Sequence, residues 1–268
     1  MKTLVNGNNA DTVSVHNRGL QYGDGIFETI AWRNQRIEHW DEHMARLAKG
    51  CTVLGIPHPD FELLKNEAMQ LLSEDKGKQI LKIILARSSN GRGYQPAKTQ
   101  SVDRILSCHE WPENIESLAE QGIDCIICTT RLGDNPQLAG IKHLNRLEQV
   151  LAAQELLHSE AHEGIMLDQH EQVISGTRSN LFIIKNEILY TPTIDNCGIH
   201  GIMRENILRI ADGLHLKSEI KPLNMQDLLS ADEVFLSNSI MKIWPVNNIE
   251  QTHYTQHTWT QKIKTTLQ

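Results

Sequence analysis

Short apolar runs separated by turn residues dominate the second half of the chain. They recur at residues 165–167, 181–184, 188–190 and 234–236, after a longer β-branched run at 124–130. Runs of this length and composition are typical of strands. Because few helical patterns interrupt them, the sequence predicts a mixed, barrel-like sheet and an α+β (mixed α/β) fold.

The first half of the chain mixes strand and helix patterns. Asn6-Gly7 predicts a hairpin turn, and Asp60 is a candidate N-cap for a helix that ends before the polar run at 73–78. The other predicted elements are a helix at 39–50 that ends near Gly50 and strands at 26–32, 80–86 and 104–108. We place the domains at residues 1–112 and 123–268, joined by a polar connection at 113–122.

Charge and hydropathy exclude several classes of function. The formal net charge is −7 and no block of Lys and Arg is present, which argues against a nucleic-acid partner. No apolar run is long enough for a membrane span, and the N-terminus does not have the pattern of a signal peptide. We therefore expect a cytoplasmic protein that binds a small molecule.

The cysteines and histidines do not indicate a metal site. Cys125 and Cys128 form a CxxC pair, but no second ligand pair stands at zinc spacing. Their run is apolar and β-branched, which favours a buried strand with free thiols. The thirteen histidines are scattered, so no metal is expected.

Lys142 lies between a loop rich in glycine and proline and a helical pattern. The pattern places Leu144, Leu147, Val150 and Leu151 on one side, so we expect Lys142 just ahead of a helix N-terminus. The partial positive charge there lowers a lysine pKa and favours a nucleophile for carbonyls or pyridoxal phosphate (PLP). On these residues alone, a solvated loop lysine remains the alternative.

Other features suggest an anion site, although each also has an ordinary structural explanation. Gly19, Gly23 and Gly25 indicate either a close approach of the backbone to another group or a simple glycine turn. Arg46 points either inward as a phosphate ligand or outward to solvent. A predicted helix beginning at Ile202 and the segment Ser237 to Ser239 offer amides and hydroxyls to an anion.

These motifs together resemble a known family. LGDNPQLAGIKHLNRLEQVLA is similar to the lysine segment of the aminodeoxychorismate lyases, which are fold-type IV PLP enzymes. The similarity extends, in matching order, through RGLQYGDGIFET, SSNGRGY, SNLF, GIHGIMR and SNSIMKIWPV. The string KHLNRLEQV favours a lyase over the related aminotransferases.

The resemblance implies a homodimer of two-domain chains, each with a smaller N-terminal α/β domain and a larger C-terminal barrel-like domain. PLP would lie between the domains, bound to Lys142 as an imine. The expected cofactor-binding residues are Lys142, Arg46, Ser175, Ile202, Met203, Asn238, Ser239 and Ile240.

The implied reaction converts 4-amino-4-deoxychorismate into 4-aminobenzoate and pyruvate, a step toward folate. Lys142 would remove the ring proton next to the amine, and Thr29 would assist proton handling. Arg92 is the first candidate for the substrate carboxylates, followed by Arg87.

One position departs from the family pattern. Where relatives usually carry a glutamate that pairs with the pyridine nitrogen, this chain has Ser175. A serine offers only a neutral hydrogen bond, which should weaken transamination more than elimination unless Glu171 or another acid compensates. The alternatives are an aminotransferase acting on D-amino or branched-chain amino acids and a PLP-binding paralogue without turnover.

Overall fold

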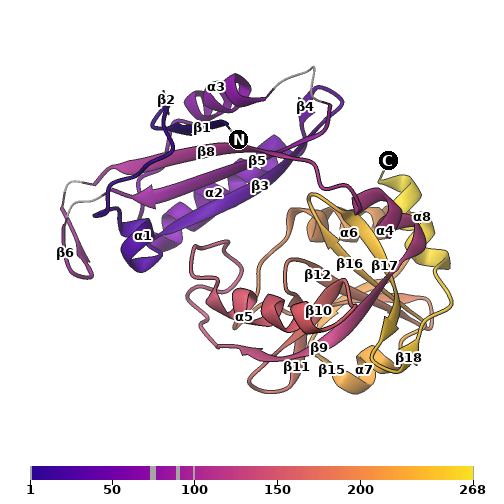
Figure 1. Cartoon of the computed structure of the whole chain (residues 1–268). Helices are drawn as coiled ribbons and strands as arrows, with labels where there is room; N and C mark the ends of the chain where they lie inside the picture. Colours follow the sequence, from indigo (N-terminus) through magenta and orange to yellow (C-terminus); the bar gives the residue numbers. More distant parts are fainter. Residues whose placement is uncertain (1, 73–76, 89–90, 99, 268) are drawn as a thin grey trace. The chain divides into compact units, whose positions relative to one another are not determined.

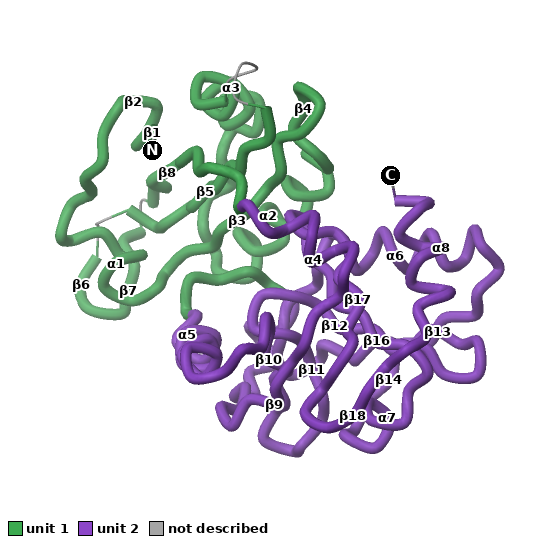
Figure 2. The backbone as a smooth tube through the Cα atoms, turned by 45° about the vertical axis from the view of Figure 1, so that its right-hand side comes forward, with its two compact units in different colours: residues 1–112, 141–145 green, residues 113–140, 146–268 purple. Residues whose placement is uncertain are grey.

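A computed structural model describes residues 2–72, 77–88, 91–98 and 100–267. The chain forms two compact units, of which unit 1 comprises Met1–Pro112 with Ile141–Asn145 and unit 2 comprises Glu113–Gly140 with Arg146–Gln268 (Figure 2). The expected connection, residues 113–122, belongs to unit 2 and contains helix α4 (Ile115–Gln121). Trp244 Nε1 donates a hydrogen bond to Ile115 O at 3.1 Å, which fixes this helix to the second unit.

Unit 1 is built on a six-stranded antiparallel sheet in the order β2-β1-β8-β5-β3-β4 (Figure 1). The strands are β1 (Lys2–Val5), β2 (Asn8–Asn9), β3 (Gly25–Arg33), β4 (Arg36–Ile37), β5 (Gln79–Arg87) and β8 (Val102–Glu110). Helices α2 (Trp40–Leu54) and α3 (Phe61–Leu71) bury their apolar sides with one face of this sheet in a single core. A short hairpin of β6 (Gly91–Arg92) and β7 (Gln95–Pro96) follows β5.

Most predicted elements of unit 1 are confirmed. Asn6 and Gly7 have φ of 51° and 81° in the hairpin between β1 and β2. Asp60 caps α3, because its Oδ1 accepts from the amides of Glu62 and Leu63 at 2.9 and 3.1 Å. The three predicted strands are present with slightly wider bounds.

Two predictions for unit 1 were wrong at glycines. Helix α2 does not end at Gly50, where a Cβ would come within 3.1 Å of Ile26, but continues to Gly55, which takes the left-handed conformation at φ 62°. Gly50 therefore allows α2 to pack closely against Ile26 of β3. The turn expected around Gly19 contains a short helix, α1 (Arg18–Tyr22), which Gly23 ends.

Unit 2 contains a ten-stranded sheet. Its strands are β9 (Ile123–Leu132), β10 (Glu163–Asp168), β11 (Gln172–Gly176), β12 (Asn180–Lys185), β13 (Ile188–Pro192), β14 (Ser218–Lys221), β15 (Leu223–Asn224), β16 (Glu233–Asn238), β17 (Lys242–Ile249) and β18 (Thr252–His253). Six of them follow the order β12-β16-β17-β9-β10-β11, and the pairing of β11 with β12 closes this path into a ring. The predicted barrel-like sheet is thereby confirmed.

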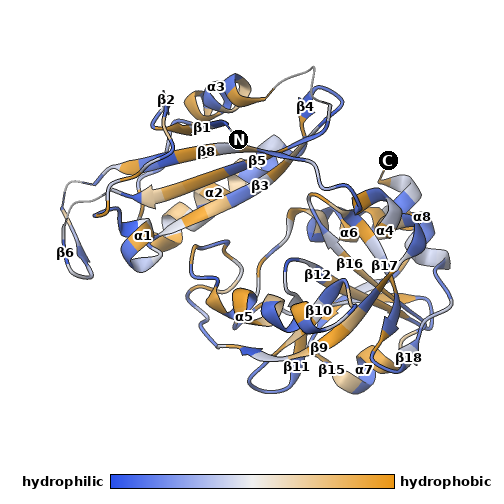
Figure 3. Ribbon diagram, in the orientation of Figure 1, coloured by the Kyte–Doolittle hydropathy of each residue, from blue (hydrophilic) through white to orange (hydrophobic). Residues whose placement is uncertain are grey.

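Apolar residues fill the barrel and the layer outside it. Figure 3 shows the apolar character of β9, which contributes Ile123 and Cys125 to the largest buried cluster. Outside the barrel, helices α6 (Ile202–Gly213) and α8 (Thr258–Thr266) cover stacked Phe182 and Phe235, whose ring centroids lie 4.9 Å apart. Helix α7 (Met225–Leu229) follows β15.

Helix α5 (Leu147–Glu155) and the 3-10 turn η2 (Leu156–His158) have an exposed apolar side. Leu147, Val150 and Leu151, predicted to lie on one side of a helix, are 77%, 50% and 52% exposed. Ala152 is fully buried instead. The apolar stripe was correctly located in the sequence, but it faces away from the core of its own unit.

The cysteine prediction is confirmed within the described residues. Cys125 and Cys128 lie buried on β9 as free thiols. Burial first, and then the charges of Glu155 and Glu163, raise the pKa of Cys128 to about 12. A thiol in this state is unreactive.

No helix among the described residues is long and apolar enough to cross a membrane.

Candidate active site

Backbone pairing with strand β3 fixes the position of Lys142. The amide of Phe27 donates to Lys142 O at 2.9 Å, and the amide of Leu144 donates to Gly25 O at 3.0 Å. His143 pairs with Ile26 as an antiparallel bridge. Residues 142–144 thus extend the edge of β3, which explains why this short segment belongs to unit 1.

The side chain of Lys142 contacts an aromatic ring. Its Nζ lies 4.2 Å from the centroid of Phe27, a distance typical of a cation–π contact. Helix α5 starts only at Leu147. The expected position just ahead of a helix N-terminus is therefore wrong, and because the field of a helix terminus falls off within one turn, a helix dipole does not explain reactivity at Lys142.

The glycines before β3 allow the lysine segment to approach. A Cβ on Gly25 would lie 2.5 Å from Leu85 O and 2.8 Å from Leu144 Cδ1. A Cβ on Gly23 would lie 2.5 Å from Asn145 Oδ1, and its φ of 64° also favours glycine. Of the two interpretations of this glycine cluster, the close approach is the correct one, and the residues after Lys142 are what approaches.

Arg46 lies in a buried cluster with Glu28 and His43. Arg46 Nε donates to Glu28 Oε1 at 2.8 Å and its Nη2 donates to Glu28 Oε2 at 2.5 Å, while His43 Nδ1 lies 2.6 Å from Oε2. Glu28 and His43 are 1% and 0% exposed. Arg46 therefore points inward, and Glu28 holds its guanidinium in one orientation.

The protonation states follow from burial and charge. Burial alone would raise the pKa of Glu28, but Arg46 and the hydrogen bonds from His43 and Arg46 outweigh it and lower the pKa to about 2. Burial lowers the pKa of His43 despite the neighbouring carboxylate. His43 is thus neutral, donates through Nδ1, and leaves Nε2 buried without a hydrogen-bond partner in the described structure.

The two substrate candidates differ in accessibility. Arg87, the second candidate, is the last residue of β5 and 6% exposed. It donates to Asp24 Oδ2 at 2.9 Å and to Gly55 O at 2.8 Å. Arg92 is exposed at the β6–β7 hairpin. Arg18 holds this hairpin by donating to Gly93 O and Tyr94 O at 2.8 and 3.0 Å. Ser89 and Asn90 of the same motif lie outside the described residues.

Thr29 lies on β3 opposite Lys82 of β5, half-buried. Because neighbouring residues of a strand face opposite sides, Thr29 shares a face with Phe27, whereas Glu28 faces α2. The ring of Phe27 lies 5.7 Å from Lys82 Nζ. Thr29 and the Phe27 ring contacted by Lys142 are therefore on the same side of the sheet.

Three polar residues of unit 2 form a row across the barrel strands. Ser175 of β11 pairs with Asn180 of β12, which pairs with Ser237 of β16. Asn180 Nδ2 donates to Ile199 O at 2.9 Å, just before α6, and a Cβ on Gly201 would lie 1.9 Å from Asn180 Oδ1. The row therefore runs to the N-terminus of α6.

The groups at this terminus fit a phosphate ester. The first amides of a helix have no partner within the helix, and among the described residues no hydrogen bond uses the amides of Ile202 or Met203. Ser237 Oγ is buried and likewise without a partner there. Free amides and a hydroxyl at a helix N-terminus are typical donors to an anion.

The segment that follows β16, Asn238 to Ile240, fits the expected phosphate-binding role only in part. Asn238 Oδ1 accepts from the amides of Ile240 and Met241 at 2.8 and 2.9 Å. The Ile240 amide, expected to bind phosphate with Ser239, is thus already used to shape this turn. Ser239 is half-exposed in the turn.

Ser175 does not gain a carboxylate from Glu171. Ser175 is 9% exposed and its Oγ donates to Gly176 O at 2.9 Å. Glu171 is exposed and binds Arg131 at 2.8 and 3.0 Å. The buried acid of this region, Glu163, accepts hydrogen bonds from the Thr177 hydroxyl and amide.

Sequence reasoning missed Glu28, although a signal was present. In the run IFETIAW, period-two alternation places Glu28 on the same face as Ile26 and Ile30. A carboxylate on an apolar face must be paired, and His43 and Arg46 on the next predicted helix were the available partners.

The chain is similar in sequence and in fold to known proteins. A sequence model described as amino-transferase class IV matches residues 25–249. The chain is 36% identical over 245 residues to an aminodeoxychorismate lyase of Vibrio harveyi (91% of this chain, 90% of that protein) and 29% identical over 259 residues to a D-alanine aminotransferase of Bacillus licheniformis (93% and 89%). The solved structure of 4-amino-4-deoxychorismate lyase from Pseudomonas aeruginosa matches with a TM-score of 0.93 and 40% identity, covering 99% of this chain and 97% of that chain.

The buried carboxylate predicts a distinct response to acid. Its pKa falls from 4.5 to about 2, so its stabilisation is fully present above pH 4.5 and is lost as the pH falls toward 2. Glu28→Gln should lower the free energy of unfolding at pH 7 by about 3 kcal/mol, because a buried ion pair loses one partner. Urea unfolding at pH 7, 4 and 3 should show this difference shrinking below pH 4.5. The exposed control Glu62→Gln should change little, and a difference for Glu28→Gln that is constant with pH would contradict the assignment.

Proposed function

This chain belongs to the class IV aminotransferase family, and we propose that it is a PLP-dependent lyase that converts 4-amino-4-deoxychorismate into 4-aminobenzoate and pyruvate. Its fold is that of fold-type IV enzymes. The observation that carries the proposal is the position of Lys142. Backbone hydrogen bonds hold its segment against β3, and Gly23 and Gly25 leave room for the residues that follow it. The two lyases named above support the reaction.

Lys142 has two roles in this proposal. Its Nζ would hold PLP, and once the substrate amine has released it, the same nitrogen would accept the proton from the ring carbon next to that amine. The Phe27 ring, 4.2 Å away, stabilises the ammonium that this transfer creates. Bound PLP supplies an electron sink for the bonds that break.

The cofactor phosphate is assigned to Arg46 and to the donors at α6. Glu28 and His43 position Arg46, because the pKa of about 2 keeps the carboxylate ionised at any physiological pH. Ile202 and Met203 offer amides, and Ser239, in the turn that Asn238 and Ile240 shape, completes the proposed set. The buried hydroxyl of Ser237, which the sequence already indicated as a donor to an anion, has no partner in the described structure and is included in the set.

Ser175 favours elimination over transamination. A serine cannot pair ionically with the pyridine nitrogen, and Glu171 is bound to Arg131 instead. Elimination depends less on an ionic partner of the pyridine nitrogen, because the leaving group departs as negative charge develops. The similarity to a D-alanine aminotransferase supports aminotransferase activity as the second candidate, and retention of the lysine segment argues against a PLP-binding paralogue without turnover.

A product assay tests the proposed reaction. The purified holoenzyme given 4-amino-4-deoxychorismate should release 4-aminobenzoate, followed by its fluorescence, and pyruvate in equal amounts. Lys142→Ala should lower this rate at least about 10³-fold, because both the covalent link and the base are lost, whereas Lys65→Ala on the exposed side of α3 should not. Absence of both products, with amino transfer from D-alanine to 2-oxoglutarate, would instead identify an aminotransferase.

Arg92 is proposed to bind a substrate carboxylate. Loss of a charge-assisted hydrogen bond costs roughly 1.5–3 kcal/mol, so Arg92→Ala should raise the KM about ten-fold or more. PLP content, read from absorbance, should stay at the wild-type level. Arg36→Ala, an equally exposed arginine on β4, is the matched control, and an unchanged KM for Arg92→Ala would remove this residue from the substrate site.

A homodimer is proposed through the exposed apolar face of α5 and η2. Leu147, Val150, Leu151 and Leu157 are 77%, 50%, 52% and 78% exposed. The helical residues are spaced three and four apart and therefore share one side. A cluster of exposed apolar side chains on one side of a helix marks an interaction surface.

Charge placed on that face should prevent association. The double substitution Leu147→Glu and Leu151→Glu should convert a dimer into a monomer at micromolar concentration, as measured by light scattering after gel filtration. Ile220→Glu on β14, where the side chain is 53% exposed, should leave the dimer intact. A monomeric wild type, or a variant that remains dimeric, would refute the proposed interface.

A further inference from the structure

We propose that Asp134, Asp168 and Cys197 of unit 2 bind a divalent transition-metal ion of the zinc type. One carboxylate oxygen of each aspartate and the Sγ of Cys197 lie within 4.8 Å of one another. Asp134 follows β9, Asp168 ends β10, and Cys197 precedes α6. No local ligand motif joins them, which is why the sequence indicated no metal.

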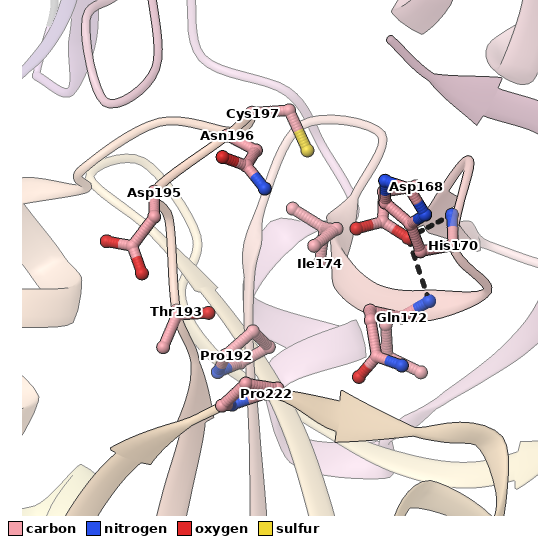
Figure 4. Close-up of a pocket in the computed structure, with 11 residues that line it drawn as sticks. Asp168, His170, Gln172, Ile174, Pro192, Thr193, Asp195, Asn196, Cys197 and Pro222 are labelled. Carbon is pink, nitrogen blue, oxygen red and sulfur yellow. Dashed lines mark hydrogen bonds between the residues drawn. The ribbon is translucent and has the colours of Figure 1, made fainter. Parts of the chain in front are cut away.

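Two of the three donors are buried and keep an atom available. Asp168 is 5% exposed, and its Oδ1 accepts from the amides of His170 and Gln172, both at 2.9 Å (Figure 4). Within the described residues, its Oδ2 has no hydrogen bond. Cys197 is 8% exposed and its thiol forms neither a disulfide nor a hydrogen bond there. Figure 4 shows its sulfur pointing to the side of the pocket where Asp168 lies.

Asp134 is held in place by a histidine. His170 Nε2 lies 2.8 Å from Asp134 Oδ2, and no other hydrogen bond to the carboxylate of Asp134 occurs in the described part of the chain. Its Oδ1 is therefore available to a ligand. Carboxylates that bind metals are commonly oriented by such an outer hydrogen bond, and His170 has this position here.

A pocket lined by two of the three donors, Asp168 and Cys197, has room for an ion and its water ligands. It has a volume of about 210 Å³ and is lined by residues that include Asp168, His170, Ile174, Thr193 and Cys197. A tetrahedral zinc site takes thiolate, imidazole and carboxylate ligands and accepts water as the fourth. Calcium and magnesium prefer sets made of oxygen alone, so the thiol selects a softer ion.

A metal at this position would join two loops that are already paired. The amide of Asn135 donates to Asn196 O at 2.7 Å, and the amide of Gly140 donates to Gly198 O at 3.1 Å. The first loop leads to the lysine segment and the second leads to α6. The ion would thus have a structural role, because it would hold together the loop before Lys142 and the loop before α6.

Metal binding to the untagged holoenzyme tests the proposal. After treatment with chelator, equilibrium dialysis against Zn²⁺ should give one equivalent per chain with micromolar affinity, and Co²⁺ as a probe should show a thiolate-to-metal charge-transfer band. Cys197→Ser should abolish that band and weaken Zn²⁺ binding at least ten-fold. Cys108→Ser, which removes a half-buried thiol in unit 1, is the matched control and should change neither.

Asp134→Asn separates metal binding from folding. Asp134 is exposed, so this variant should fold normally by circular dichroism while its affinity for Zn²⁺ falls at least ten-fold. Zn²⁺ should raise the Tm of the wild type, since a ligand that binds the native state stabilises it, and should not raise that of the variant. Stoichiometric binding that survives both Cys197→Ser and Asp134→Asn, or no saturable binding below millimolar Zn²⁺, would overturn the site.

Discussion

The two backbone hydrogen bonds between residues 142–144 and the start of β3 are the interaction on which the candidate site depends. They tie a segment from the middle of the sequence to the first domain, at 2.9 and 3.0 Å. The glycines before β3 make this contact sterically possible, because a side chain on Gly25 would overlap Leu144. The segment of Lys142 and the strand that begins at Gly25 are therefore one structural element, although more than a hundred residues separate them in sequence.

Burial of charge is the second constraint on unit 1. Glu28 is withdrawn from water on an otherwise apolar face, and Arg46 with His43 replaces its hydration. An arrangement of this kind contributes little net stability compared with apolar packing, but it leaves a guanidinium with a single orientation. Asp24 is a second carboxylate that orients arginines. It accepts hydrogen bonds from Arg18 and Arg87 at 2.8 and 2.9 Å, and through Arg18 it connects the hairpin of Arg92 to the sheet.

The sequence predicted element types well and the environments of individual side chains less well. Period-two runs and the Asp60 cap identified the strands and α3 because these signals are local. The burial of Arg87 and the exposure of the apolar side of α5 were not predicted, because a local pattern does not say which neighbour a side chain meets. Glu28 and the cluster of Asp134, Asp168 and Cys197 were missed for a related reason: their neighbours in space are distant in sequence. For the candidate site, the sequence predicted a helix N-terminus next to Lys142, whereas the structure shows that backbone pairing with β3 holds this segment.

The ring of strands in unit 2 is closed at one rung, the pairing of Ser175 with Asn180. Its other junctions are ladders of several residue pairs, such as the five between β12 and β16. A cylinder joined by a single rung has a seam, and thermal fluctuations that part neighbouring strands begin where the fewest hydrogen bonds must break. The amides along this seam should therefore exchange with solvent sooner than those of the opposite wall, so the most compliant line of the barrel passes through Ser175.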